Sequence, residues 1–407
     1  MEALTINILN EAVRAGGPAS LCERIELVPA GGVSSIVSPA KYTTSNGNPT
    51  YIFEYRNVAV QSENGSTFEL QKAVLIDSKN SHANRLEQIF TDALKDGKGL
   101  LSKMPRIRVT YSVGDAGTKS YFDTQLPHRA FDGHIRVGDH QGEPTTVVDE
   151  YREARNATLD DLLPLFTLSP DTVAFGGWDS TRSRNQLRIP SVFNGEIIGI
   201  LADQSDRDPS IHRAGARVDP VEASVSFAND KKAREAILRD ATDLSASAQK
   251  SFSSKGKGST IGLGAIPPSV GNDNLDGVAI SNAICTHVLS FAMLRTFRFG
   301  KGPEGDEAIR ALIAAMILRA MAGYNADPVL RANCYLVESA KPEMTLDMRN
   351  GESKDLEPLT PESAEALLQA AYEQAHDKAG IIWEGQTFEV DGNPAVIANS
   401  SADEGDN

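Results

Sequence analysis

The stretch "VLIDSKNSHANRLEQIF" (residues 74–90) joins a short apolar run to an unusually polar helix start. Residues 74–76 are apolar and are typical of the buried end of a strand. Residues 85–96 then place apolar side chains on one face of a helix. A cap from Ser78 or Ser81 explains one or two of the polar residues between these two elements.

Several polar side chains of this stretch are more than capping requires. They are Lys79, Asn80, His82, Asn84 and Arg85. Amides, hydroxyls and a guanidinium at a helix start suit a phosphodiester backbone, because exposed N–H groups and the helix dipole favour anions there. Three interpretations stay open at this point: a contact with nucleic acid, a plain capped helix, and a catalytic constellation.

Hydrophobic periodicity elsewhere predicts strands mixed with helices, which favours an α+β or α/β sheet domain. The predicted strands are 23–28, 51–60, 71–76, 106–113, a short one early in 171–191, and 194–201. The predicted helices are 2–15, 85–96, a buried one from near Asp306 to Gly323, and one from Pro361 to Gly380 with Thr360 as its cap. Residues 202–220 are rich in Asp, Ser, Arg and Pro, and residues 245–275 are rich in Ser, Gly and Lys and then in Pro. Both segments are predicted to be exposed, mobile loops.

Composition predicts a soluble protein of two or three structural units. The chain has 407 residues, of which 40% are hydrophobic and 23% charged. It has no apolar run near the roughly 20 residues that span a bilayer, and the first residues lack the features of a signal peptide. We therefore expect a cytoplasmic protein with no membrane contact. Its three cysteines are far apart and predict neither a disulfide framework nor a zinc site.

The charge distribution is compatible with RNA binding although the net charge is −15. Residues 338–407 hold 16 acidic and 4 basic residues, so the rest of the chain is close to neutral. Basic clusters lie in that remainder, and local clusters decide whether phosphate can bind.

Motifs for catalysis, metals and nucleotides are not found. In "SKGKGST" (254–260), Gly256-Lys257 is followed by glycine, whereas a P-loop requires serine or threonine there. "HRAFDGHIRVGDH" (128–140) matches no zinc spacing and is interpreted as a polar loop with solvated histidines, or as an RNA contact. We therefore predict no enzyme activity, no cofactor and no metal.

Five segments, in this order, resemble one known family. They are the opening stretch, "HRAFDGHIR" (128–136), "FGGWDSTR" (175–182), "IGLGAIPPS" (261–269) and "LSFAMLRTFRFG" (289–300). The sequence resembles the backbone subunit of type I-G (formerly I-U) CRISPR surveillance complexes (Cascade), within the RAMP superfamily. The likeness extends over roughly residues 18–340.

This resemblance implies a modified RNA-recognition-motif (RRM) fold with a ferredoxin-like βαββαβ palm and long thumb-like and finger-like insertions. It divides the chain into an RRM-like core at 1–340, an acidic helical extension at 341–390 and a disordered tail at 391–407. Several copies would polymerise along a CRISPR guide RNA (crRNA), beside a large subunit and a fused guide-processing and cap subunit. The protein would position the guide, and base pairing would recognise target DNA.

The resemblance also implies RNA-binding residues. They are Ser78, Asn80, Ser81, Asn84, Arg85, His128, Arg129, Asp132, Trp178, Arg182, Arg184, Lys255 and Lys257. Trp178 could stack on a base, although a lone tryptophan is expected more often in the core. Lys255 and Lys257 are interpreted equally well as a mobile finger or as a solvated linker. The aromatic signature of ordinary RNA-recognition motifs is missing, so base stacking on the sheet face is not predicted.

Two alternatives come from other functional classes. The chain could be a metal-dependent RNA endonuclease that uses the loop carboxylate of Asp132 or Asp179, as related type III backbone subunits do. It could also be an unrelated soluble protein in which all five segments have only structural roles.

Overall fold

A computed structural model describes residues 1–43, 49–62, 65–112, 117–184, 186–205, 225–264 and 277–398. The chain forms two compact units, one of residues 1–204 and 279–407 and the other of residues 205–278. Antiparallel sheets and helices are mixed in the larger unit, so the predicted α+β class is confirmed. None of the helices within the described ranges combines the length and the apolar character needed to cross a membrane.

The main sheet of the larger unit is antiparallel throughout and has the order β17-β16-β1-β14-β13-β6-β5. Its strands are β1 (Ser20–Pro29), β5 (Phe53–Ser62), β6 (Gly65–Asp77), β13 (Phe193–Leu201), β14 (Val278–Ser290), β16 (Glu343–Asp347) and β17 (Ser353–Leu356). Short strands β15 (Leu336–Glu338) and β2 (Ile36–Val37) pair with β1 and β14. Another short pair joins β3 (Tyr42–Thr43) and β4 (Pro49–Thr50).

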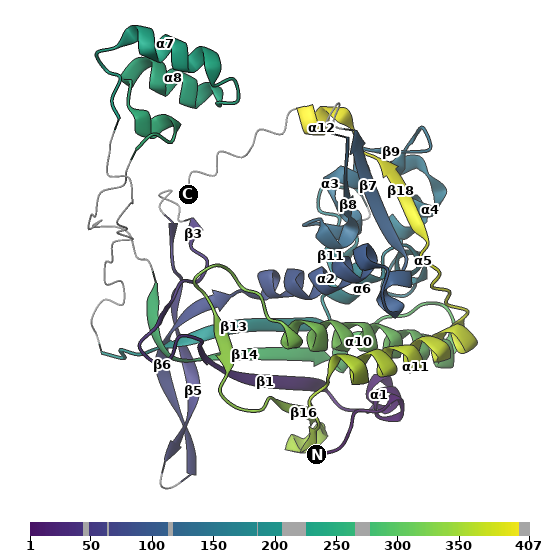
Figure 1. Ribbon diagram of the computed structural model, residues 1–407. Coiled ribbons are helices and arrows are strands. Elements are labelled where there is room, and N and C mark those ends of the chain that lie inside the picture. Colours follow the sequence, from purple (N-terminus) through teal and green to yellow (C-terminus); the bar gives the residue numbers. More distant parts are fainter. Residues whose placement is uncertain are drawn as a thin grey trace. The chain divides into compact units, whose positions relative to one another are not determined.

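Two crossover helices connect the central strands of this sheet. Helix α2 (Lys79–Asp96) lies in the chain between β1 and β13, and α10 (Gly302–Ala326) lies between β14 and β16. The two helices pack on each other, and α1 (Ile6–Val13) and α11 (Pro361–Ala379) pack against α10 (Figure 1). Strand β1 alternates accordingly: Leu21, Glu23 and Ile25 are buried on the helix side, and the residues between them are half exposed.

A second sheet of the same unit includes a strand from the C-terminal part of the chain. Its order is β10 (Glu143–Pro144), β9 (Asp139–His140), β18 (Thr387–Asp391), β7 (Arg106–Ser112) and β8 (Thr118–Phe122). Because β18 pairs with β7 and β16 completes the main sheet, the acidic C-terminal region is part of the body of the larger unit. A boundary at residue 340 would separate both strands from their sheets, and the division at 340 and 391 stays a prediction.

Short helices connect the two sheets, and one of them replaces a predicted strand. They are α3 (Gly133–Arg136), α4 (Asp149–Arg155), α5 (Leu163–Leu168), α6 (Pro170–Phe175) and α9 (Phe291–Leu294), with the strand pair β11 (Gly177–Trp178) and β12 (Arg188–Ile189) and a last helix α12 (Pro394–Ala398). The predicted strand early in 171–191 is α6, which starts at a proline and ends before Gly176. A short apolar run has no clear period, and Pro170 at the first helical position favours the helix.

The smaller unit contains α7 (Lys231–Asp240), α8 (Ala246–Lys255) and a 3₁₀ turn at 258–261. Ser245 caps α8 by accepting a hydrogen bond from the Ala248 N–H at 3.2 Å, and Phe252 is buried against Phe227. The first part of the predicted loop at 245–275 is therefore helical. The remainder of that loop from 265, most of 202–220, and the tail from 399 lie outside the described residues.

Candidate nucleic-acid interface

Helix α2 begins at Lys79, earlier than the hydrophobic pattern alone predicted. The Ser78 hydroxyl caps it by accepting a hydrogen bond from the Ser81 N–H at 3.4 Å. Asn80 and Asn84 are exposed, one helical turn apart. The capped-helix interpretation therefore accounts for Ser78, while the two asparagines are free to meet a ligand.

A cleft of about 440 Å³ lies between α2 and the end of α10. It is lined by Ser81, Asn84, Arg85, Gln88, Ile89, Asp92, Gly323, Tyr324, Asp327 and Val329. The cleft is lined by amides, hydroxyls and two carboxylates. The guanidinium of Arg85 is hydrogen-bonded to other groups of the protein. Such a surface suits hydrogen bonds to hydroxyls and bases more than a run of phosphates.

The Arg85 guanidinium donates hydrogen bonds to protein acceptors. Its Nε donates to Asp77 Oδ2 at 2.8 Å, and one terminal nitrogen donates to the carbonyls of Val329 and Leu330 at 2.6 and 3.1 Å. These bonds join the segment after α10 to α2, and the contact of Arg85 with a guide phosphate stays a prediction.

A buried polar chain continues from Asp77 into the core. His82 Nδ1 lies 2.9 Å from Asp77 Oδ2, and His82 Nε2 lies 2.7 Å from His287 Nε2. His287 Nδ1 in turn lies 2.8 Å from Glu23 Oε2, which also accepts a hydrogen bond from the Asn325 amide at 2.8 Å. We call His82, His287, Asp77, Glu23 and the adjacent Cys285 the histidine cluster.

The histidine cluster has strongly perturbed electrostatics. Burial lowers the pKa of His82, against the effect of Asp77. Burial also acts to lower the pKa of His287. Cys285 and the Glu23 carboxylate outweigh this effect and raise the pKa of His287 to about 10. Burial would raise the pKa of Asp77, yet hydrogen bonding from His82 and the charge of Arg85 hold it below its usual range.

The sequence analysis missed most of this cluster. A signal was available in the sequence, because buried and half-exposed residues alternate along β1 and Glu23 lies at a buried position between the apolar Leu21 and Ile25. A charged residue in that phase indicates a buried polar partner. The partner itself, His287, is distant in sequence and could not be identified from spacing.

The loop at 128–136 is mostly internal. Arg129 donates to both oxygens of Glu87, at 2.5 and 2.8 Å, and to the Gly176 carbonyl at 3.0 Å. The buried Asp132 caps α3 by accepting from the His134 N–H at 2.9 Å. Arg129 and Asp132 therefore stabilise the loop, and their predicted RNA contacts stay predictions. The third predicted contact of this loop, His128, is exposed.

The loop at 175–188 presents an aromatic and two cations. Trp178 is 48% exposed, so its core interpretation is wrong, and the Arg188 guanidinium lies 4.1 Å from the centre of its ring. Arg184 is exposed without a described partner. Arg182 instead donates to the Arg155 carbonyl at 2.7 Å and to Asn156 Oδ1 at 2.6 Å, and its phosphate contact stays a prediction.

The two predicted lysines of the smaller unit are exposed. Lys255 ends α8, and Lys257 follows it. The described part of this unit, residues 225–264, holds seven lysines and arginines and four acidic residues. Residues 225–264 therefore carry an excess of positive charge, which is compatible with a polyanion.

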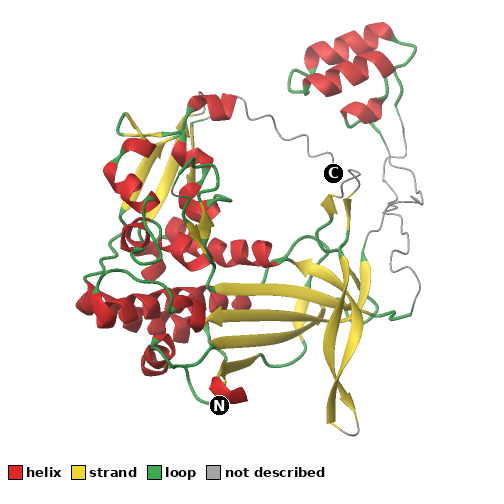
Figure 2. Cartoon of the chain, turned by 180° about the vertical axis from the view of Figure 1, so that it is seen from behind, coloured by secondary structure: helices red, strands yellow, loops and turns green. Residues whose placement is uncertain are grey.

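The β5–β6 hairpin has an exposed apolar face that the sequence analysis did not recognise. Figure 2 shows this pair extending past the other strands of the sheet. Tyr55, Leu70 and Phe68 are 62%, 66% and 76% exposed. The register places all three on one face, because Tyr55 pairs with Lys72, Asn57 with Leu70 and Ala59 with Phe68. We call these three residues the hairpin face.

Comparison with known proteins gives one family. Residues 21–204 match the family model described as CRISPR-associated protein GSU0053 (Cas_GSU0053). The matched segment runs from β1 through β13 and includes α2, the hairpin and the loops at 128–136 and 175–188. The chain has no match among curated proteins.

Proposed function

We propose that this chain, residues 21–204 of which match the Cas_GSU0053 family model, is a CRISPR-associated protein and the crRNA-binding backbone subunit of a type I-G Cascade. Copies of the chain bind side by side along the guide and present its spacer to target DNA. Base pairing supplies the specificity, and the protein supplies the positioning.

The connectivity of the main sheet supports an RRM-like palm. The order β16-β1-β14-β13, with α2 and α10 as crossovers, is that of a βαββαβ unit. Strands β6 and β5 extend the sheet past β13. The face away from the helices carries ion pairs such as Arg56–Glu196, at 2.8 Å, so RNA contacts are expected from helix starts and loops instead.

The hairpin face carries this proposal. Three large apolar side chains on one side of a projecting hairpin lose hydration free energy in water and mark a contact with a partner. Aromatic rings stack on any base, with about 1–3 kcal/mol per base. We assign the hairpin as the thumb that presses between bases of the guide, with Tyr55 and Phe68 as the stacking residues.

The exposed polar residues give the remaining contacts. Asn80 and Asn84 contact guide phosphates or 2′-hydroxyls beside the cleft on α2. Trp178 stacks with a base while Arg184 meets a phosphate, and the smaller unit contacts guide or target strand through Lys255 and Lys257. Each phosphate contact releases condensed counterions, so binding weakens steeply with salt.

We propose a non-catalytic role, and the positions of the two carboxylates of the rival endonuclease hypothesis support it. Asp132 is buried as a helix cap, and the buried Asp179 accepts two hydrogen bonds from Arg155 at 2.9 and 2.7 Å. Both groups are buried and do not lie at the surface. Magnesium added to the protein–guide complex with a matched RNA is expected to give no cleavage. Cleavage that Asp132→Ala or Asp179→Ala abolishes would establish the endonuclease instead.

The decisive experiment is purification from cells that also express a CRISPR array and the partner subunits. We expect a large particle with a high 260/280 nm absorbance ratio and guides of uniform length. The Tyr55→Ser/Phe68→Ser variant is expected to yield RNA-poor, smaller particles. Glu69→Ser, on the opposite face of the same hairpin, is the matched control and should assemble normally. An RNA-free monomer from the unchanged chain would overturn the proposal.

Phosphate contacts are tested with Arg184 and Arg182, which are two residues apart but differ in their partners. Arg184→Ala should weaken guide binding about equally for all sequences and reduce the salt slope by roughly one unit. Arg182→Ala should mainly lower stability, because its guanidinium bonds Arg155 and Asn156. Equal salt slopes for Arg184→Ala and the unchanged chain would remove Arg184 from the interface.

A further inference from the structure

The histidine cluster brings together three atoms that commonly bind transition metals. His82 Nε2, His287 Nε2 and Cys285 Sγ all lie within 4.8 Å of one another, and all three residues are buried. The two nitrogens are 2.7 Å apart, and the sulfur lies 3.4 Å from His287 Nε2. They come from α2 and β14, so a shared ion would join the helix to the sheet.

The carboxylates around the cluster orient both imidazoles toward each other. Asp77 and Glu23 each accept from an Nδ1, at 2.9 and 2.8 Å, which leaves the lone pair of each Nε2 directed inward. Two lone pairs at this separation repel unless a proton or a metal ion lies between them. A carboxylate behind each imidazole is the usual outer arrangement of metal-binding histidines.

We propose that His82, His287 and Cys285 bind a divalent ion of the zinc type. Histidine nitrogen and cysteine thiolate are the ligands that zinc prefers. Replacing one proton between the imidazoles and the thiol proton by a divalent cation leaves the total charge of the cluster unchanged. The surrounding Asp77, Glu23 and Arg85 charges are therefore balanced equally well with the ion bound.

The space around the cluster fits this ligand set. A tetrahedral zinc ion with bonds of about 2.0–2.1 Å keeps its nitrogens roughly 3.3 Å apart, so the rings need to separate by only about 0.6 Å. Gly195 of β13 provides the room: a Cβ there would lie 2.4 Å from His82 Cδ2 and 3.1 Å from His287 Cδ2.

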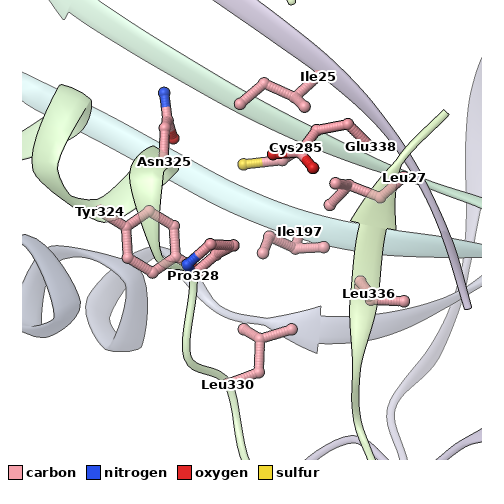
Figure 3. Close-up of a pocket in the computed structure, with 10 residues that line it drawn as sticks. All are labelled: Ile25, Leu27, Ile197, Cys285, Tyr324, Asn325, Pro328, Leu330, Leu336 and Glu338. Atoms are coloured by element: carbon pink, nitrogen blue, oxygen red, sulfur yellow. The ribbon is translucent and has the colours of Figure 1, made fainter. Parts of the chain in front are cut away.

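A fourth ligand position is available on the Cys285 side. A cavity of about 20 Å³, lined in part by Cys285, Tyr324 and Asn325, has room for one water molecule. Figure 3 shows the Cys285 sulfur pointing toward the side where Tyr324 and Asn325 lie. The Tyr324 hydroxyl and Asn325 Oδ1 are buried without a hydrogen-bond partner. A metal-bound water in this cavity would satisfy both groups.

The ion would be structural and would fix α2 on the sheet, beneath the exposed Asn80 and Asn84. This inference does not depend on the proposed function. It predicts a metal in the full-length protein whether or not RNA is bound.

Metal content of the full-length protein tests the site directly. Protein purified without chelator is expected to contain about one zinc per chain by elemental analysis. Cobalt added to stripped protein should give a thiolate-to-cobalt charge-transfer band, which reports Cys285 as a ligand without any substitution. The Cys285→Ser protein should lose the charge-transfer band, and the His82→Gln protein should lose most of the metal. The Cys22→Ser protein, changed at a half-buried thiol outside the cluster, should keep both the band and the metal.

Two results would overturn the site. One is unchanged protein that holds no more zinc than Cys285→Ser and gives no charge-transfer band with cobalt. The other is a band that Cys22→Ser abolishes and Cys285→Ser retains. In the first case the two imidazoles share a proton. Far-ultraviolet circular dichroism of each variant separates loss of the metal from loss of the fold.

Discussion

The histidine cluster and the hairpin face are both exceptions to the rule that apolar side chains are buried and polar ones exposed. The cluster is polar and buried, whereas the hairpin face is apolar and exposed. The cluster has acids and imidazoles in a core where apolar side chains are normal, and every charge has an opposite charge beside it. The hairpin face has large apolar side chains in water, with nothing in the described larger unit covering them. Buried polar groups fix one arrangement of elements, whereas exposed apolar groups indicate a contact that the isolated chain does not make.

The largest expected effect is on stability, at Glu23. Glu23→Gln removes the charge beside His287 and should lower the free energy of unfolding by about 3 kcal/mol or more, since a broken buried pair leaves an uncompensated charge. Urea denaturation measures this loss. Glu26→Gln is the matched control on the same strand, where the pair with Arg24 is solvent exposed and contributes about 0–1 kcal/mol. Equal losses would mean that the cluster is not specially stabilising.

The next effect concerns the space that the cluster needs. Gly195→Ala places a methyl group 2.4 Å from His82 and should cost about 1–3 kcal/mol, as overpacking of a filled core does. Gly133→Ala is the control, because a Cβ there meets nothing within 4 Å. A Gly195→Ala protein as stable as its control would show that the two rings can move apart freely.

Local elements could be predicted from the sequence because their signals lie within a few residues. Strand β7 was predicted within one residue, and α11 starts after its Thr360 cap and ends before Gly380, which adopts the left-handed conformation at φ 69°. Strand β18 was missed, since it is stabilised by parallel pairing with β7. That partner is far away in sequence, and no pattern near β18 identifies it.

The candidate interface shows the same limit at the level of side chains. Arg182 and Arg184 have the same residue type in the same loop, yet of the two only Arg182 has hydrogen-bond acceptors among the described residues. Composition predicts that a loop is basic, but the acceptors that neutralise a given guanidinium come from distant segments. The metal ligands follow this rule too, because His82 and His287 meet only after α2 has packed on the sheet.

Asp123 sharpens the comparison, because it is a buried acid without a compensating cation beside it. Burial and then the nearby Asp171 raise its pKa well above the ordinary 3.8. The folded state thus binds more protons than the unfolded state, so stability falls as pH rises from about 4 through the folded pKa. Asp123→Asn should weaken this dependence and raise the free energy of unfolding at neutral pH, because the buried carboxyl no longer has to ionise. Asp149→Asn, at an exposed acid, should change neither quantity in pH-dependent denaturation.

The smallest effect on the free energy of unfolding is expected at the hairpin face, where substitutions should impair assembly most. Phe68 is 76% exposed, so Phe68→Ser should change the free energy of unfolding by less than about 0.5 kcal/mol. Val58, on the other side of the hairpin, packs on a small cluster that includes Ala73 and Ile198, and Val58→Ser should cost about 1 kcal/mol while guide binding is kept. Denaturation and guide-binding assays on both variants separate the two roles. If Phe68→Ser lost stability and kept the guide, the hairpin face would be a packing surface of the chain itself, and the thumb assignment would fail.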